Sequence, residues 1–175
     1  MKQYSKRMVV VHWLTLALLL AGWFFGDQLA DATDANKATL TGYIVHILIG
    51  ATILIVTVTR LMFRSKDGTP PPIGESAIDK IAKGIHHLLY TLLFLLPVSG
   101  FVTVVTSDAG KALLAGDASL LPKDGGYDHV FAHEIHEVLV NVLITVVAVH
   151  LLGAIKHQFI AKDGLMERMS LRRKD

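Results

Sequence analysis

The chain has 175 residues, 52% of them hydrophobic, and a mean hydropathy of +0.49. This composition is too apolar for an ordinary soluble domain and indicates a membrane protein. The formal net charge is only +2, so we expect no nucleic-acid partner. The chain has no cysteine, which excludes disulfides, iron–sulfur clusters and covalently attached haem. It also lacks the short apolar region and small-residue cleavage site of a removable signal peptide, so the first apolar segment should stay in the mature protein.

Four apolar segments are long enough to cross a bilayer as helices, at about 8–26, 41–63, 85–105 and 138–155. Trp13 and Trp23 lie towards the ends of the first segment, where interfacial aromatic residues are expected. Pro97 interrupts the third segment and predicts a kink. We find no repeat, low-complexity tract or linker. The sequence therefore predicts one all-α domain over 1–175, an integral membrane four-helix bundle.

Two of the connections between these segments are long. The connection 65–83 contains Pro70, Pro71 and Pro72 and is predicted to be a loop. The connection 106–133 is predicted to include a short interfacial helix around 111–121. Neither connection has the length or composition of a separate domain.

The distribution of Lys and Arg predicts the orientation in the membrane. The N-terminal tail, the second connection and the C-terminal tail fall on one side, and they carry Lys2, Lys6, Arg7, Arg64, Lys66, Lys80, Lys83, Lys156, Lys162, Arg168, Arg172, Arg173 and Lys174. The other two connections carry only Lys37, Lys111 and Lys123, among several acidic residues. We therefore expect both termini to be cytoplasmic.

Four histidines fall inside the predicted spans, and their depths match in pairs. His136 and His150 are fourteen positions apart on the fourth span, which returns to the same helix face and separates them by about 21 Å along the axis. His12 shares the cytoplasmic level of His150, and His46 shares the outer level of His136. A low-spin b-type haem requires two imidazoles from different helices on opposite faces of one iron. The pattern therefore predicts two haem b groups, one held by His12 and His150 and the other by His46 and His136.

Neighbouring residues fit this arrangement but also have simpler explanations. Gly50 is one turn from His46, where the absence of a side chain leaves room for a flat ring. Arg60 lies on the same face at the cytoplasmic end and is a candidate partner for a haem propionate. Its alternative role is a basic anchor that extends to the membrane surface.

Five histidines are not used in this scheme. His86 shares a helix face with Tyr90, and this pair is a candidate for hydrogen bonding to a propionate or a quinone carbonyl, or for carrying protons. The alternative for His86, as for His87 beside it, is a polar helix end. His133 is a rival to His136 as outer ligand, although it lies about 100° from the His150 face. His129 continues that outer stripe, and His157 is expected to be solvated.

The same residues carry a resemblance to a known family. A series of short motifs occurs in a fixed order over almost the whole chain. They are Ser5-Lys6-Arg7, His12-Trp13, His46 with Arg60-Leu61, His86 with Tyr90, Leu96-Pro97-Val98, His136-Glu137, His150 and the basic tail. In this the chain resembles the bacterial cytochrome b561 family, the four-helix di-haem type whose best-defined activity is superoxide oxidation coupled to quinone. The resemblance implies the same histidine pairing, ubiquinone as electron partner, and a multi-pass location in the bacterial inner membrane.

The function that follows is electron transfer through two b haems between the periplasmic face and the quinone pool, as in a superoxide:ubiquinone oxidoreductase. The acidic outer connections count against superoxide, because a site that collects an anion should be electropositive. One alternative is a non-catalytic cytochrome b subunit for a partner dehydrogenase or hydrogenase. Another is a haem-free proton or metal transporter, although the spans lack the carboxylate that proton relays usually include.

Overall fold

The computed structural model describes residues 3–71, 77–123, 126–127 and 129–172. Throughout these residues the regular structure is helical, with no β-strand. The five α-helices are α1 (Lys6–Asp34), α2 (Leu40–Asp67), α3 (Ala77–Thr106), α4 (Asp108–Ala115) and α5 (Phe131–Ile155). Short turns of other helix types cover Ala118–Leu120, Lys156–Ala161 and Leu165–Met169. Lys2, Pro72, Arg173 and Lys174, which contributed to the sequence predictions, lie outside the described residues.

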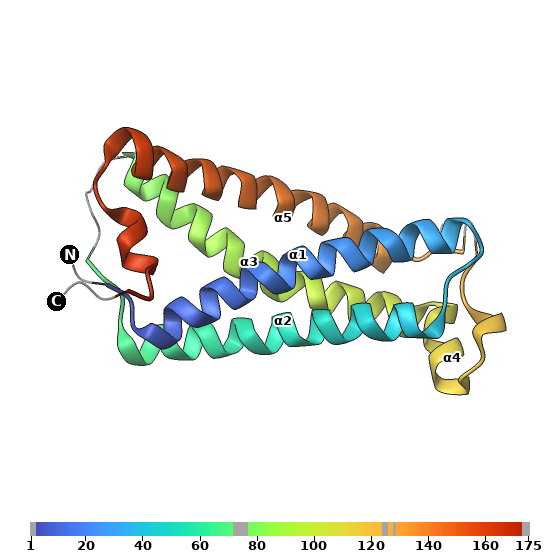
Figure 1. The fold of residues 1–175 in the computed structure, drawn as a ribbon. Helices are drawn as coiled ribbons and strands as arrows, with labels where there is room; N and C mark the ends of the chain where they lie inside the picture. Colours follow the sequence, from blue (N-terminus) through green and yellow to red (C-terminus); the bar gives the residue numbers. More distant parts are fainter. Residues whose placement is uncertain (1–2, 72–76, 124–125, 128, 173–175) are drawn as a thin grey trace.

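The four long helices lie alongside one another, and the short α4 caps one end of the bundle (Figure 1). Both chain termini are at the opposite end. Close backbone packing joins α1 to α2, α3 to α5, and α2 to α3. We refer to the two ends as the terminal end and the α4 end.

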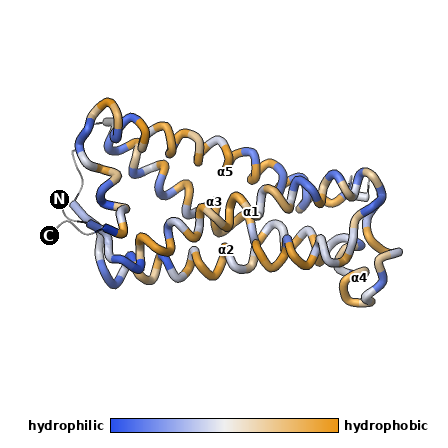
Figure 2. The backbone as a smooth tube through the Cα atoms, viewed as in Figure 1, coloured by the Kyte–Doolittle hydropathy of each residue, from blue (hydrophilic) through white to orange (hydrophobic). Residues whose placement is uncertain are grey.

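The surface of the bundle is suited to lipid rather than water. Four helices are long and apolar enough to cross a membrane, which confirms the predicted four-helix membrane bundle. Hydrophobic residues occupy the middle of the long helices, and hydrophilic residues gather towards the two ends (Figure 2). Large apolar side chains such as Trp23, Ile55 and Phe101 are more than half exposed along the sides. An apolar surface of this extent is stable when it faces hydrocarbon.

The helices extend beyond the predicted spans. The predicted loop 65–83 is wrong at both ends, because α2 continues to Asp67 and α3 begins at Ala77. The helix predicted around 111–121 instead occupies Asp108–Ala115 and ends at Gly116, whose φ of 66° lies in the left-handed region. These errors share a cause, since hydropathy marks the membrane-embedded residues and not the polar turns that continue a helix into the interface.

The terminal end is held together by polar contacts between distant segments. Arg7 and Ser5, at the start of α1, both hydrogen-bond the carboxylate of Asp67 at the end of α2. The segment after α5 folds back across this end, where the Trp13 indole donates to the Met169 carbonyl at 3.1 Å. Arg168 is 9% exposed and donates to the Pro71 carbonyl at 2.7 Å.

The fully buried residues between the helices are few. One cluster, Leu92, Leu143 and Val146, joins α3 to α5 near mid-bundle. A second cluster, formed by Tyr43 with Ala109, Ala112 and Leu121, seats α4 against α2. The histidine sites lie outside both clusters.

Candidate functional site

At the terminal end, His12 of α1 and His150 of α5 face each other. Their ring centroids are 6.4 Å apart, and the ring planes are inclined by 70°. Both side chains are half-buried. Trp13 stacks edge-on against His12 at 5.2 Å. The structure thus brings together two histidines that are far apart in the sequence.

Towards the α4 end, His46 of α2 and His136 of α5 form a second pair with nearly the same geometry. Their ring centroids are 6.3 Å apart, with the planes at 86°. Two imidazoles on opposite sides of one iron, each with a metal–nitrogen bond of about 2 Å, have centroids about 6 Å apart. Both pairs therefore have the separation that one iron between the rings requires.

The imidazole of His136 is fixed by α3. Its Nδ1 lies 2.9 Å from Ser99 Oγ and 3.1 Å from the Leu96 carbonyl. The Ser99 hydroxyl donates to the same carbonyl at 2.8 Å, so its oxygen is free to accept from Nδ1–H. This assigns the ring proton to Nδ1 and leaves Nε2 with its lone pair.

Two glycines that the sequence reasoning did not single out make room for the second pair. A Cβ at Gly26 of α1 would lie 2.9 Å from His46 Cε1, and a Cβ at Gly100 of α3 would lie 2.9 Å from His136 Cε1. Any larger residue at either position would press on an imidazole. A Cβ at Gly50, which was singled out, would meet nothing within 4 Å.

Several buried polar atoms near the histidines have no hydrogen-bond partner among the described residues, which is consistent with haem binding there. In the described part of the chain, four buried side-chain atoms lack a hydrogen-bond partner: His12 Nδ1, His46 Nδ1, Thr57 Oγ1 and Arg60 Nε. A buried polar group without a partner costs about 1–3 kcal/mol, so such groups are rare unless another molecule is bound. Two of the four atoms belong to the facing histidines. The donor set, the ring spacing and the open space beside Gly50 all suit a flat haem.

His86 lies beside the first pair, and Arg60 lies beside Tyr90. The His86 ring lies 5.3 Å from that of His150, and its Nδ1 contacts the Ala82 carbonyl at 2.7 Å. The Arg60 guanidinium is 5.3 Å from the centre of the Tyr90 ring. Arg60 is half-buried, and its enclosed Nε has no hydrogen-bond partner among the described residues.

The remaining histidines have other contacts. His133 stacks on Tyr127 at 4.2 Å and lies 3.4 Å from Glu137. His87 contacts the carbonyl one turn before it, and His129 is exposed. His157 was expected to be solvated, but its Nδ1 lies 2.5 Å from Asp163 Oδ2, because the segment after α5 turns back towards it.

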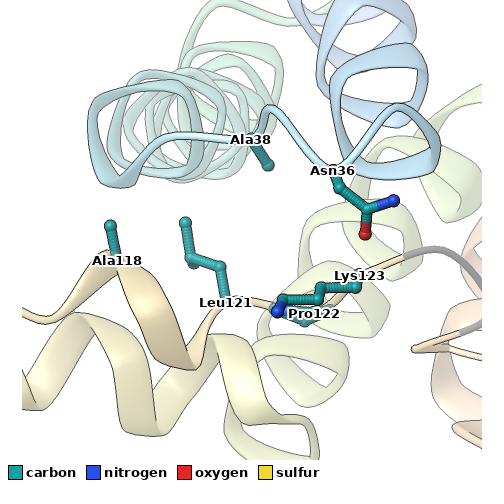
Figure 3. A pocket seen from close by; sticks show the side chains of 6 residues that line it. All are labelled: Asn36, Ala38, Ala118, Leu121, Pro122 and Lys123. Atoms are coloured by element: carbon teal, nitrogen blue, oxygen red, sulfur yellow. The ribbon is translucent and has the colours of Figure 1, made fainter.

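A polar layer closes the α4 end. The Tyr43 and Tyr127 hydroxyls are 2.7 Å apart. Burial raises the pKa of Tyr127, and the hydrogen bond with Tyr43 raises it further. Nearby, a small pocket opens between the α1–α2 turn and the segment after α4, lined by Asn36, Ala38, Ala118, Leu121, Pro122 and Lys123 (Figure 3).

The fold and the site together define a class of protein, a four-helix membrane bundle whose facing histidines occupy two levels, as in membrane cytochromes b. The comparison with known families agrees. The family model for prokaryotic cytochrome b561 matches residues 3–170, and the chain belongs to this family. It is accordingly a multi-pass membrane protein of a haem b electron-transfer family, and the haem-free transporter considered above does not fit.

Named relatives are similar along almost their whole length. Cytochrome b562 of Cereibacter sphaeroides is 29% identical over 170 residues, which cover 95% of this chain and 94% of that protein. A probable superoxide oxidase of Yersinia pestis is 25% identical, with 96% of each chain covered. Cytochrome b561 homolog 1 of Escherichia coli is also 25% identical, over 99% of this chain and 100% of its own.

Proposed function

We propose that this protein carries electrons across the bacterial inner membrane through two haem b groups, one held by His12 and His150 and the other by His46 and His136. The observation that carries the proposal is the nearly identical spacing of the two ring pairs, 6.4 and 6.3 Å. Bound haem b supplies a one-electron iron couple at each site. His136 and His150 lie about 21 Å apart along α5, a large part of the roughly 30 Å hydrocarbon core.

The terminal end is the cytoplasmic end in this proposal. Its support is the concentration of Lys and Arg in the terminal tails and in the connection between α2 and α3. The His12–His150 site is then on the cytoplasmic side, and the His46–His136 site is close to the periplasm. We refer to them as the inner and outer sites.

The inner site exchanges electrons with a membrane quinone, with ubiquinone the expected species. His86 provides a ring nitrogen next to His150, and Tyr90 and Arg60, which contact each other, provide a hydroxyl and a guanidinium. The His86 side chain is exposed on the side of the bundle, where a quinone dissolved in lipid has access. Arg60, with its unpartnered Nε, is also the residue that would bind a propionate of the inner haem.

The outer site accepts electrons from superoxide in this proposal, as the name of the Yersinia pestis relative suggests. Three lysines are available to attract a small anion at the α4 end, and their surroundings differ. Lys111 is ion-paired with Asp108 at 2.7 Å, which offsets its charge. Lys123 lines the pocket between the two connections (Figure 3). Lys37 is exposed at the same end but does not line this pocket, so we take Lys123 as the lysine that collects superoxide.

Rapid mixing of the oxidised holoprotein with superoxide, and separately with quinol, tests this function. We expect both reagents to reduce the haem, and the superoxide reaction to slow as ionic strength rises, because salt screens steering by lysine. Lys123→Gln should slow the superoxide reaction and leave quinol reduction unchanged. The double variant Asp108→Asn/Lys111→Gln is the matched control, and should change neither reaction because removing both partners of the ion pair leaves the local net charge unchanged.

If quinol reduces the haem and superoxide does not, the superoxide assignment is wrong. The chain is then a quinol-linked cytochrome subunit for a partner dehydrogenase or hydrogenase. If neither reagent reduces the haem, electron exchange with quinone is also wrong.

A further inference from the structure

The two histidine pairs have different polar surroundings, although their ring spacing is nearly the same. At the outer site, Nδ1 of His136 has two oxygen acceptors on α3, Ser99 Oγ at 2.9 Å and the Leu96 carbonyl at 3.1 Å. At the inner site, Nδ1 of His12 is buried and has no partner among the described residues. His46 Nδ1 at the outer site also has no partner among the described residues, so the difference between the sites lies in His136.

The hydrogen bonds to His136 have an electronic consequence for an iron bound there. A ligating imidazole that donates its second N–H to an oxygen acceptor becomes a more basic ligand. A more basic ligand stabilises ferric iron relative to ferrous iron, and therefore lowers the reduction potential. Ser99 is a positioning residue in this respect, because its hydroxyl also donates to Leu96 and so presents its oxygen to the His136 ring.

The inner site has a charge where the outer site has hydrogen bonds. Arg60 is half-buried with an enclosed Nε that has no partner among the described residues, and its guanidinium is near enough to His12 and His150 to act on both electrostatically. A fixed positive charge disfavours the more positive ferric state and raises the reduction potential, whether or not the arginine also binds a propionate. The two features thus act in opposite directions at the two sites.

We propose that Ser99 and Arg60 set the two haem sites at different reduction potentials, with the outer site lower and the inner site higher. This inference rests on the proposed function, and it adds a direction. An electron at equilibrium resides mainly at the inner site, next to the residues suited to quinone. The chain is therefore built to move electrons from the α4 end to the terminal end.

Anaerobic potentiometric titration of the purified holoprotein, followed by absorbance and electron paramagnetic resonance, tests the inference. The outer signal is the one lost in His46→Ala. We expect Ser99→Ala to raise the reduction potential of the outer haem by about 59 mV, which corresponds to a tenfold change in the one-electron reduction equilibrium. The reduction potential of the inner haem should not change. Ser99→Thr, which keeps the hydroxyl, should restore the original value. Thr103→Ala is the matched control, since Thr103 lies one turn further along α3 and bonds only the Ser99 carbonyl.

The second arm concerns the inner site. Arg60→Gln should lower the reduction potential of the inner haem. Arg60→Lys should leave that potential close to its wild-type value because the positive charge is kept. Arg64→Gln is its control, since Arg64 is one turn along α2 and also lies over the Tyr90 ring, at 5.9 Å. The inference is overturned if the wild-type outer potential is the higher one, or if Ser99→Ala and Ser99→Thr leave both potentials unchanged. A single haem per chain would instead overturn the proposed function, and the ordering of two sites with it.

Discussion

The four facing histidines come from three long helices. The α5 helix contributes one histidine to each pair, and α1 and α2 contribute the other two. In each pair the rings meet at an angle of 70° or more rather than stacking. Such an arrangement is unlike the parallel stacking of His133 on Tyr127, which has a 22° angle and serves to pack a loop. The two candidate ligand pairs share an edge-on geometry and a centroid separation of 6.3–6.4 Å, whereas the edge-on contact of His86 with His150 is shorter, at 5.3 Å.

Single substitutions of the histidines test the pairing. We expect His12→Ala and His150→Ala to perturb the same haem, and His46→Ala and His136→Ala to perturb the other. Loss of one ligand should leave a five-coordinate or water-ligated iron, visible as a high-spin signal in electron paramagnetic resonance. His133→Ala is the control and should leave both haems low-spin, because its ring stacks on Tyr127. If His133→Ala removes a haem and His136→Ala does not, the pairing is wrong.

The two glycines beside the outer pair give a second test. Gly100→Ala and Gly26→Ala would each place a Cβ 2.9 Å from an imidazole carbon. Overpacking of this kind costs about 1–3 kcal/mol. We therefore expect lower occupancy or an altered spectrum of the outer haem alone. Gly84→Ala in α3 has no atom within 4 Å of the new Cβ and should stabilise the helix by about 0.5–1 kcal/mol. Unchanged outer-haem spectra in both Gly26 and Gly100 variants would show that the rings have room to move.

The residue-scale predictions from sequence succeeded where depth and helix period were sufficient. Position along a span predicted that His12 would share a level with His150 and that His46 would share a level with His136, and the rings of each pair do face each other. Ser99, Gly26 and Gly100 were missed because their roles depend on which faces of two different helices meet. The local signal for all three was that a small residue stands in an apolar span. Small residues are common where two membrane helices approach closely.

At the scale of elements, the segment after α5 is the part of the fold that hydropathy could not predict. It is polar and short, yet it closes the terminal end by contacts with residues far away in the sequence. The Tyr4 amide donates to the Arg168 carbonyl at 3.1 Å, and Trp13 donates to Met169. Because Trp13 also touches His12, this segment is linked to the inner site.

Arg168 provides a test of that closure. Its guanidinium donates to the Pro71 carbonyl at 2.7 Å, and a buried charged hydrogen bond contributes about 1.5–3 kcal/mol. Arg168→Ala should therefore lower the temperature of thermal unfolding of the detergent-solubilised holoprotein. Arg172→Ala, at an exposed position in the same segment, is the control and should have little effect. Equal unfolding temperatures for the two variants would mean that the segment does not stabilise the bundle.

Helix ends illustrate the limit of sequence prediction at this scale. The apolar core of each span was identified correctly, but each helix continues into the polar interface. Basic residues such as Arg64 and Lys66 extend α2, since positive charge is favourable at a helix C-terminus. Gly68, with a φ of 71°, marks where that helix ends.

For the whole molecule, the architecture follows from two requirements. Backbone groups in a bilayer must be hydrogen-bonded within their own segment, which restricts the spans to helices. The facing histidines must be held at fixed separation across the gap between the α1–α2 pair and the α3–α5 pair, and the packing of α2 against α3 joins these two pairs. With so few fully buried residues between the helices, bound haem would supply much of the missing core. Removal of haem should therefore loosen the bundle.

The central claim is that one chain holds two haem b groups between histidine pairs. Quantitation of haem against protein, with electron paramagnetic resonance on the same fully loaded sample, tests it most directly. We expect two b haems per chain, both low-spin and six-coordinate, and both extractable by acid–acetone because the chain has no cysteine to hold them. One haem per chain, or a haem that resists extraction, would contradict it.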